Sequence, residues 1–166
     1  MLLWKMFIDL CLLRANPQDL PTSTPLTVLA VGAYWLTDVI GVLDTLSWSS
    51  AVIAAVTDTL LLVAATTMAL RLRQSENRLP QTLSALAGSG AMLSALAWLA
   101  TSLSRGTIPP EWVWLPFLVW YTVVFGHVLR HALTISFAAG VAIGFLYLIL
   151  SIGVTGALVG PVSSEV

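Results

Sequence analysis

The sequence predicts an all-α protein, a polytopic membrane bundle of about five transmembrane helices preceded by an N-terminal interfacial helix. Of its 166 residues, 58% are hydrophobic and only 9% are charged, too few charges to solvate a globule of this size. The apolar residues form continuous runs long enough to cross a ~30 Å hydrocarbon core. None of these runs alternates with the period of two that barrel strands show, so the spans are expected to be helices.

The first 21 residues are predicted to be a cytoplasmic or interfacial segment. The apolar run over residues 1–13 is too short to span, and Lys5 and Asp9 interrupt it. No small-x-small cleavage pattern follows, which argues against a signal peptide. We therefore expect a helix at the membrane interface, anchored by Trp4, with a poorly ordered leader as the alternative.

A transmembrane domain is predicted over residues 22–166, after an elbow that contains three prolines. Polar or charged breaks separate its apolar runs. The weakest break, at Arg130, His131 and Thr134, is required because residues 113–158 are too long for one crossing. The approximate spans are 26–47, 51–70, 82–103, 113–129 and 133–158.

Charge asymmetry predicts the orientation in the membrane. With the N-terminus in the cytoplasm, only Arg105 and no other basic residue lies outside, so the positive-inside rule favours N-in and C-out. A bacterial cytoplasmic membrane is the expected location. The basic residues then on the cytoplasmic side are Lys5, Arg14, Arg71, Arg73, Arg78 and Arg130.

Composition also argues against several classes of function. Basic and acidic residues nearly cancel, so no nucleic-acid partner is expected. The single cysteine, Cys11, allows neither an internal disulfide nor a cysteine-built zinc site, and inert packing is expected for it. No cofactor, metal or catalytic motif is predicted, and the serines in the spans have no neighbouring base. The chain is therefore expected not to be an enzyme.

Asp38 and Asp58 are the most informative pair of residues. Each lies ten residues from Trp48 along one arm of the first helical hairpin, which predicts similar depths of ~15 Å from the turn. Intramembrane acids are rare and usually face the bundle interior. If the two acids face each other, a shared proton or a bound cation is favoured. If they are separated and protonated, and donate hydrogen bonds to backbone carbonyls or threonine oxygens, a structural role is favoured.

His127 is the other polar residue predicted within a span. It shares a helix face with Arg130 and His131, but no third metal ligand accompanies the two histidines. We expect His127 to make a polar contact in the bundle, with proton relay to Asp58 as the alternative. Arg130 is expected to be a cytoplasmic anchor that extends toward the interface.

Small residues predict close helix packing on two spans. Such residues let backbones approach in lipid, where no hydrophobic drive brings helices together. The contacts can lie within one chain or between chains, and packing within the chain is the simpler expectation. The residues are Ser84, Gly88, Ala91 and Ala95 on the third span, and Gly140 and Gly144 on the fifth.

Three segments carry a family resemblance: FIDLCLLRANPQDLPTS, QTLSALAGSGAMLSALAWL and WVWLPFLVWYTVVFGHVLRHALTIS. They resemble prokaryotic relatives of the Yip family of five-span membrane proteins. The family's D-L-Y-G-P type motif is represented only by Gln18-Asp19-Leu20-Pro21, a departure that argues against Rab binding. The resemblance implies a non-enzymatic membrane organiser or adaptor.

Two functions are therefore predicted. The first is an organiser, scaffold or adaptor that acts through helix contacts with a second copy or another membrane protein. The second is a proton- or cation-linked transporter of small solutes that uses Asp38 and Asp58.

Overall fold

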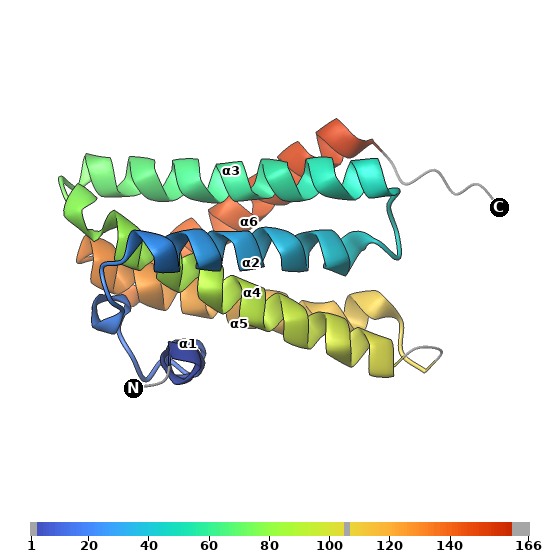
Figure 1. Cartoon of the computed structure of the whole chain (residues 1–166), viewed down its shortest axis with the longest axis horizontal. Helices are drawn as coiled ribbons and strands as arrows, with labels where there is room; N and C mark the ends of the chain where they lie inside the picture. Colours follow the sequence, from blue (N-terminus) through green and yellow to red (C-terminus); the bar gives the residue numbers. More distant parts are fainter. Residues whose placement is uncertain (1–2, 105–106, 161–166) are drawn as a thin grey trace.

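The computed structural model describes residues 3–104 and 107–160, which form a bundle of helices (Figure 1). The predicted position of Arg105 on the outer side falls outside the described residues, as do residues 1–2 and 161–166. The elements are α1 (Leu3–Cys11), the 3-10 helix η1 (Pro17–Asp19), α2 (Thr24–Val42), α3 (Trp48–Leu72), the 3-10 helix η2 (Glu76–Arg78), α4 (Leu79–Leu103), α5 (Pro110–Leu133) and α6 (Phe137–Val159).

Helices α2 to α6 are each long and apolar enough to cross a membrane. Many of their large apolar side chains face outward, as Leu60 on α3 and Ile149 on α6 illustrate with exposed fractions of 63% and 53%. Such an apolar exterior suits lipid rather than water. The prediction of an all-α, multi-pass membrane bundle is therefore confirmed.

Local capping sets the helix ends, and some ends differ from the sequence prediction. Helix α2 stops at Val42 rather than near residue 47, and the hydroxyl of Ser47 then caps α3 by accepting from the Ser50 amide at 3.3 Å. Helix α5 continues to Leu133 and ends at Thr134, which adopts a left-handed conformation (φ 56°, ψ 48°). Helix α6 consequently begins at Phe137, later than expected.

The two ends of the bundle are built differently. We call the end where α2, α4 and α6 begin the α1 end, and the end where α3 and α5 begin the opposite end. Helix α1 lies across the bundle beside α4 and α5 and is seen end-on in Figure 1. A 3-10 turn, η1, also packs on α4 and α5.

Helix α1 is held by packing and by hydrogen bonds. The ring of Phe7 lies against the backbone of Gly88, in space that a Cβ would fill. The indole Nε1 of Trp120 donates to the Cys11 carbonyl at 2.8 Å, satisfying one of the orphan carbonyls at the end of α1. Cys11 itself is a buried free thiol. The helix predicted in the N-terminal segment is thus docked on the bundle, while Trp4 is exposed.

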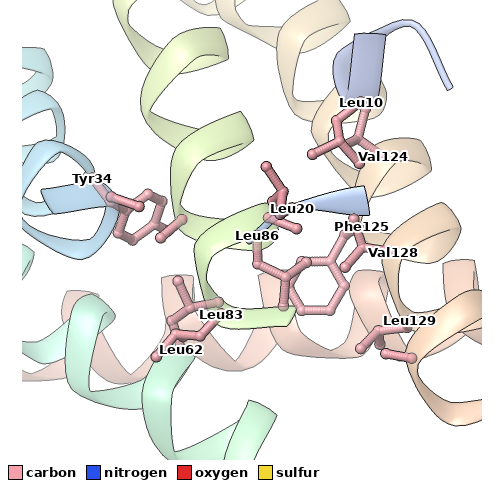
Figure 2. Packing of buried hydrophobic residues seen from close by; sticks show 14 of the residues in the cluster. Leu10, Leu20, Tyr34, Leu62, Leu83, Leu86, Val124, Phe125, Val128 and Leu129 are labelled. Atoms are coloured by element: carbon pink, nitrogen blue, oxygen red, sulfur yellow. The ribbon is translucent and has the colours of Figure 1, made fainter. Parts of the chain in front are cut away.

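The main apolar core lies toward the α1 end, between α1, α4 and α5 with contributions from α3 and α6 (Figure 2). Figure 2 shows Leu86 among Phe125, Val128 and Leu20, with Leu10 from α1 beside Val124. All of these side chains are at most 3% exposed. This end of the bundle is consequently filled with side chains.

The predicted small residues lie mostly at contacts within the chain. Gly140 lies against the Gly126 carbonyl, so α5 and α6 touch backbone to backbone. Gly144 faces the ring of Phe125. Ser84 is buried, and its hydroxyl lies 2.9 Å from that of Thr27 on α2.

The other two small residues of the α4 stripe differ in exposure. Ala91 is buried, whereas Ala95, one turn further along the helix, is exposed. The stripe therefore leaves the interior of the bundle before the opposite end is reached.

The predicted cytoplasmic arginines all lie at the α1 end. Arg78 donates to the carbonyls of His131 and Ala132 at 3.2 and 3.1 Å, where α5 leaves carbonyls without helical partners. Arg71 forms an exposed ion pair with Glu76 at 3.5 Å. Arg73 and Arg130 are also exposed.

Candidate functional site: an intramembrane cavity with two carboxyl groups

Asp58 lies at the centre of a cluster of hydroxyl groups inside the bundle. The hydroxyl of Tyr34 on α2 donates to Oδ2 of Asp58, and the hydroxyl of Tyr147 on α6 donates to Oδ1 at 2.9 Å. The hydroxyl of Ser151, one turn after Tyr147, donates to Oδ1 as well. Three donors from two other helices therefore hold one carboxyl group in place.

Asp38 shares this region with Asp58. Both carboxyl groups line a single cavity of about 420 Å³. The prediction of equal depth assumed a helix on both sides of Trp48, ten residues long to each aspartate. Helix α2 ends at Val42, so this assumption does not hold for Asp38. Asp58 bonds to Tyr34, the residue one helical turn before Asp38, and the pair meets in the cavity nonetheless.

The cavity extends from the acid pair toward the opposite end of the bundle. Its deep part is lined by residues from the middle of the helices, including Tyr34, Asp58 and Tyr147. Its outer part is lined by Thr45 just beyond α2 and by Pro110 at the start of α5. The cavity thus connects the two carboxyl groups with one end of the bundle.

Aromatic residues of α5 form one wall of the cavity. Trp114, Phe117 and Tyr121 follow at intervals of three and four residues, so they share one face of the helix. The indole of Trp114 reaches across to α2, where a Cβ on Gly41 would lie 3.4 Å from it. This contact places the indole about one turn beyond Asp38, toward the opposite end.

A glycine on α4 makes room for the tyrosines in the deep part of the cavity. A Cβ on Gly90 would lie 2.7 Å from the ring of Tyr34 and 3.1 Å from that of Tyr121. The Tyr121 hydroxyl lies beside that of Tyr34 but makes no hydrogen bond of ordinary geometry with any described residue, although it is buried. It is thus a polar group available to a molecule in the cavity.

Phe125 separates the cavity from the core at the α1 end. Its ring stacks on Tyr147 with centroids 5.2 Å apart and meets Tyr121 edge-on at 5.8 Å. Phe125 is 3% exposed and is packed with the core residues shown in Figure 2. The two tyrosines at the floor of the cavity therefore pack on an aromatic ring of the core.

The contacts of His127 do not include either acid of the pair. Its Nε2 is 3.0 Å from the Ala15 carbonyl in the segment that follows α1, and its ring meets that of His131 at 4.8 Å. These contacts agree with a polar packing residue and give no route to Asp58. Among the described residues, no group of three or more His, Cys, Asp or Glu side chains is placed to hold a metal ion.

Sequence reasoning identified the two acids but missed their partners. The chain has three tyrosines, and all of them line the cavity. This was a detectable signal, because tyrosines in membrane proteins gather at the interfaces, whereas these lie within spans. Ser151 gave no comparable signal, since serines are common in membrane helices.

In chemical terms the site combines two acids, several hydroxyl groups and an aromatic wall within reach of one end of the bundle. Such a site can bind a proton or a cation in low-dielectric surroundings. A comparison with known protein families, curated proteins and solved structures finds no match to this chain. Function has therefore to be argued from the geometry of the site.

Proposed function

We propose that this protein is a proton-linked transporter of a small solute, with Asp38 and Asp58 as the groups that exchange protons with the solute. The observation that carries the proposal is the meeting of both carboxyl groups in one cavity that reaches the opposite end of the bundle. Acids that served only as structural hydrogen-bond donors would need neither each other nor a cavity.

The two acids have different parts in this proposal. Asp58 is held by three hydroxyl groups and stays fixed as the anchor. Asp38 lies between this anchor and the mouth of the cavity, so it is the carboxyl that a solute reaches first. Two neighbouring carboxyls in low dielectric do not both ionise easily, which couples the loss of a proton to the arrival of a compensating group.

The proposed orientation follows the basic residues. Every Lys and Arg among the described residues lies at the α1 end, which the positive-inside rule places in the cytoplasm. The cavity then opens on the outer side of the cell membrane. In bacteria this is the cytoplasmic membrane. Reporter fusions at the two chain ends should report opposite compartments, the N-terminal one cytoplasmic.

The organiser function that the sequence favoured stays a prediction, together with the Yip resemblance. It rests on the absence of catalytic motifs, on the small soluble parts and on the small-residue stripes, and of the stripes Gly88, Gly140 and Gly144 are occupied by contacts within the chain. These residues are therefore not needed to explain a contact with another protein. For this reason we prefer the transport proposal.

Proteoliposomes that contain the full chain and an internal pH-sensitive dye test the proposal. Phenyltrimethylammonium, alanine and glucose, added outside in separate experiments, represent cationic, zwitterionic and neutral solutes. We expect at least one of them to change the internal pH, and the Asp38→Asn and Asp58→Asn variants to abolish the change. Proton movement that both variants retain, or no movement with any of the three solutes, would overturn the proposal.

A further inference from the structure

We propose that the cavity binds a monovalent organic cation with an apolar or aromatic body, the positive group against Asp38 and Asp58 and the body along the aromatic wall of α5. This inference rests on the proposed function and names the class of solute. It concerns binding and not transport, so the two can fail separately.

The sign of the charge follows from the cavity lining. Two of the lining residues are aspartates, and none is a lysine, arginine or histidine. The described basic residues lie at the other end of the bundle, where Arg78 and Arg71 are engaged with backbone carbonyls and with Glu76. An anion in the cavity would meet two carboxyl groups without a compensating charge, whereas a cation is attracted.

The magnitude of the charge follows from the acid pair. Two carboxyl groups that line one cavity inside a low-dielectric bundle do not both ionise easily, which favours a net charge of about −1 on the pair. A divalent metal ion needs about six oxygen ligands, and no group of three acidic, histidine or cysteine side chains occurs among the described residues. The pair therefore matches a single positive charge.

The organic character follows from the walls and the size of the cavity. Its volume of about 420 Å³ is far larger than an inorganic ion requires and falls in the range of small-molecule pockets. Trp114, Phe117 and Tyr121 line the cavity along α5, and a cation over an aromatic ring is attracted to the electron-rich face of that ring. The buried Tyr121 hydroxyl offers one further polar contact.

The test measures binding of phenyltrimethylammonium to the purified full chain in detergent by equilibrium dialysis. This ion carries a permanent charge, and tert-butylbenzene is its neutral isostere. We expect the cation to bind at least about tenfold more tightly than the isostere, and benzenesulfonate not to bind. Equal affinity for the isostere, or binding of the sulfonate, would overturn the proposal.

Substitutions then locate the binding. Asp38→Asn should weaken the cation by more than about tenfold, while Asp9→Asn on α1 serves as the matched control and should leave it unchanged. Trp114→Leu should weaken it several-fold and Trp114→Phe should restore most of the loss, because an aromatic ring is retained. Affinity that neither Asp38→Asn nor Trp114→Leu alters would contradict the assigned position.

The pH dependence gives an independent check. The titratable groups that face the site are Asp38 and Tyr34 on α2, Asp58 on α3, Tyr121 on α5 and Tyr147 on α6, and α4 contributes none to the cavity lining. Protons compete with the cation for the acids, so the affinity should fall as the pH falls. The assay compares pH 8 with pH 5, and an affinity that stays the same would contradict the role of the acid pair.

Competition with sodium ions tests whether the site takes an organic or an inorganic cation. Sodium chloride should displace no more phenyltrimethylammonium than magnesium chloride of the same ionic strength does. Selective displacement by sodium would assign the site to an inorganic cation and overturn the inference. Proton movement driven by alanine or glucose without binding of phenyltrimethylammonium would overturn this inference and leave the transport proposal standing. Binding of phenyltrimethylammonium without proton movement would overturn the transport proposal and leave this inference standing.

Discussion

The α1 end and the opposite end of this bundle are made from the same apolar helices, yet one end is filled and the other is hollow. At the α1 end, glycine contacts bring α5 and α6 together and Phe7 onto α4, and leucine, valine and phenylalanine side chains fill the interior. At the opposite end, the same helices enclose a cavity of about 420 Å³ with two aspartates. A bundle with one sealed end and one open end presents its buried acids to a single side of the membrane.

The contrast follows from side-chain size and polarity. Small residues permit close backbone contact and dispersion attraction, which hold helices together in lipid. Bulky aromatic rings together with carboxyl and hydroxyl groups keep the helices apart and need hydrogen bonds within the protein. Substitutions at the two ends should accordingly have effects of different kinds.

The largest effect on stability is expected at the contact between α5 and α6. Gly140→Ala places a methyl group against the Gly126 carbonyl, and such overpacking costs about 1–3 kcal/mol. Gly153→Ala on the same helix is the control, because nothing lies within 4 Å of a Cβ there. Unfolding in detergent, followed by circular dichroism, measures the stability of both variants. Equal stabilities would contradict a tight backbone contact between α5 and α6.

The next effect is expected at the hydroxyl cluster. Asp58→Leu removes the acceptor of three hydroxyl groups and should cost about 1–3 kcal/mol, because buried donors are left without partners. Asp58→Asn keeps a side-chain oxygen and should recover part of the loss. The same unfolding assay applies, and a leucine variant as stable as the wild type would show that the cluster is not a structural anchor.

A smaller effect is expected where Arg78 meets the end of α5. Arg78→Gln removes the guanidinium that donates to two carbonyls and should cost about 1 kcal/mol. Arg73→Gln, an exposed residue at the same end, is the control and should change little. If both variants lose the same stability, general charge rather than capping is responsible.

The last effect is expected from the thiol of α1 and is confined to alkaline pH. Burial raises the pKa of Cys11 from 9.0 to about 11, so the folded state holds the thiol proton more tightly than the unfolded chain does. The resulting stabilisation is present below pH 9 and is lost as the pH rises through about 11. Thermal unfolding across this window should show a fall that Cys11→Ala lacks; identical profiles would contradict the docking of α1.

The number and type of helices could be predicted from the sequence because lipid imposes length and continuity on each span. The ends were less predictable, since they depend on local caps such as Ser47 and Thr134, which ordinary polar breaks resemble. The position of Asp38 and Asp58 inside the bundle followed from the tendency of intramembrane acids to face the bundle interior.

The partners of these acids could not be predicted, because they come from other helices. Tyr147 and Ser151 lie 89 and 93 residues from Asp58 along the chain, and only the packing of α3 on α6 brings them together. Spacing within one helix predicts faces, but it does not predict which faces meet.

The most direct test of the account compares two serines on α4 in a Cys11→Ala background. Ser94 lines the cavity, whereas Ser89 is buried at the α1 end and bonded to the Ala85 carbonyl at 2.6 Å. In sealed vesicles, Ser94→Cys should react with a water-soluble cationic methanethiosulfonate faster than with the anionic reagent, and Ser89→Cys should react with neither. Equal reactivity at both positions, or a preference for the anionic reagent at Ser94→Cys, would contradict an acidic cavity that is open at one end only.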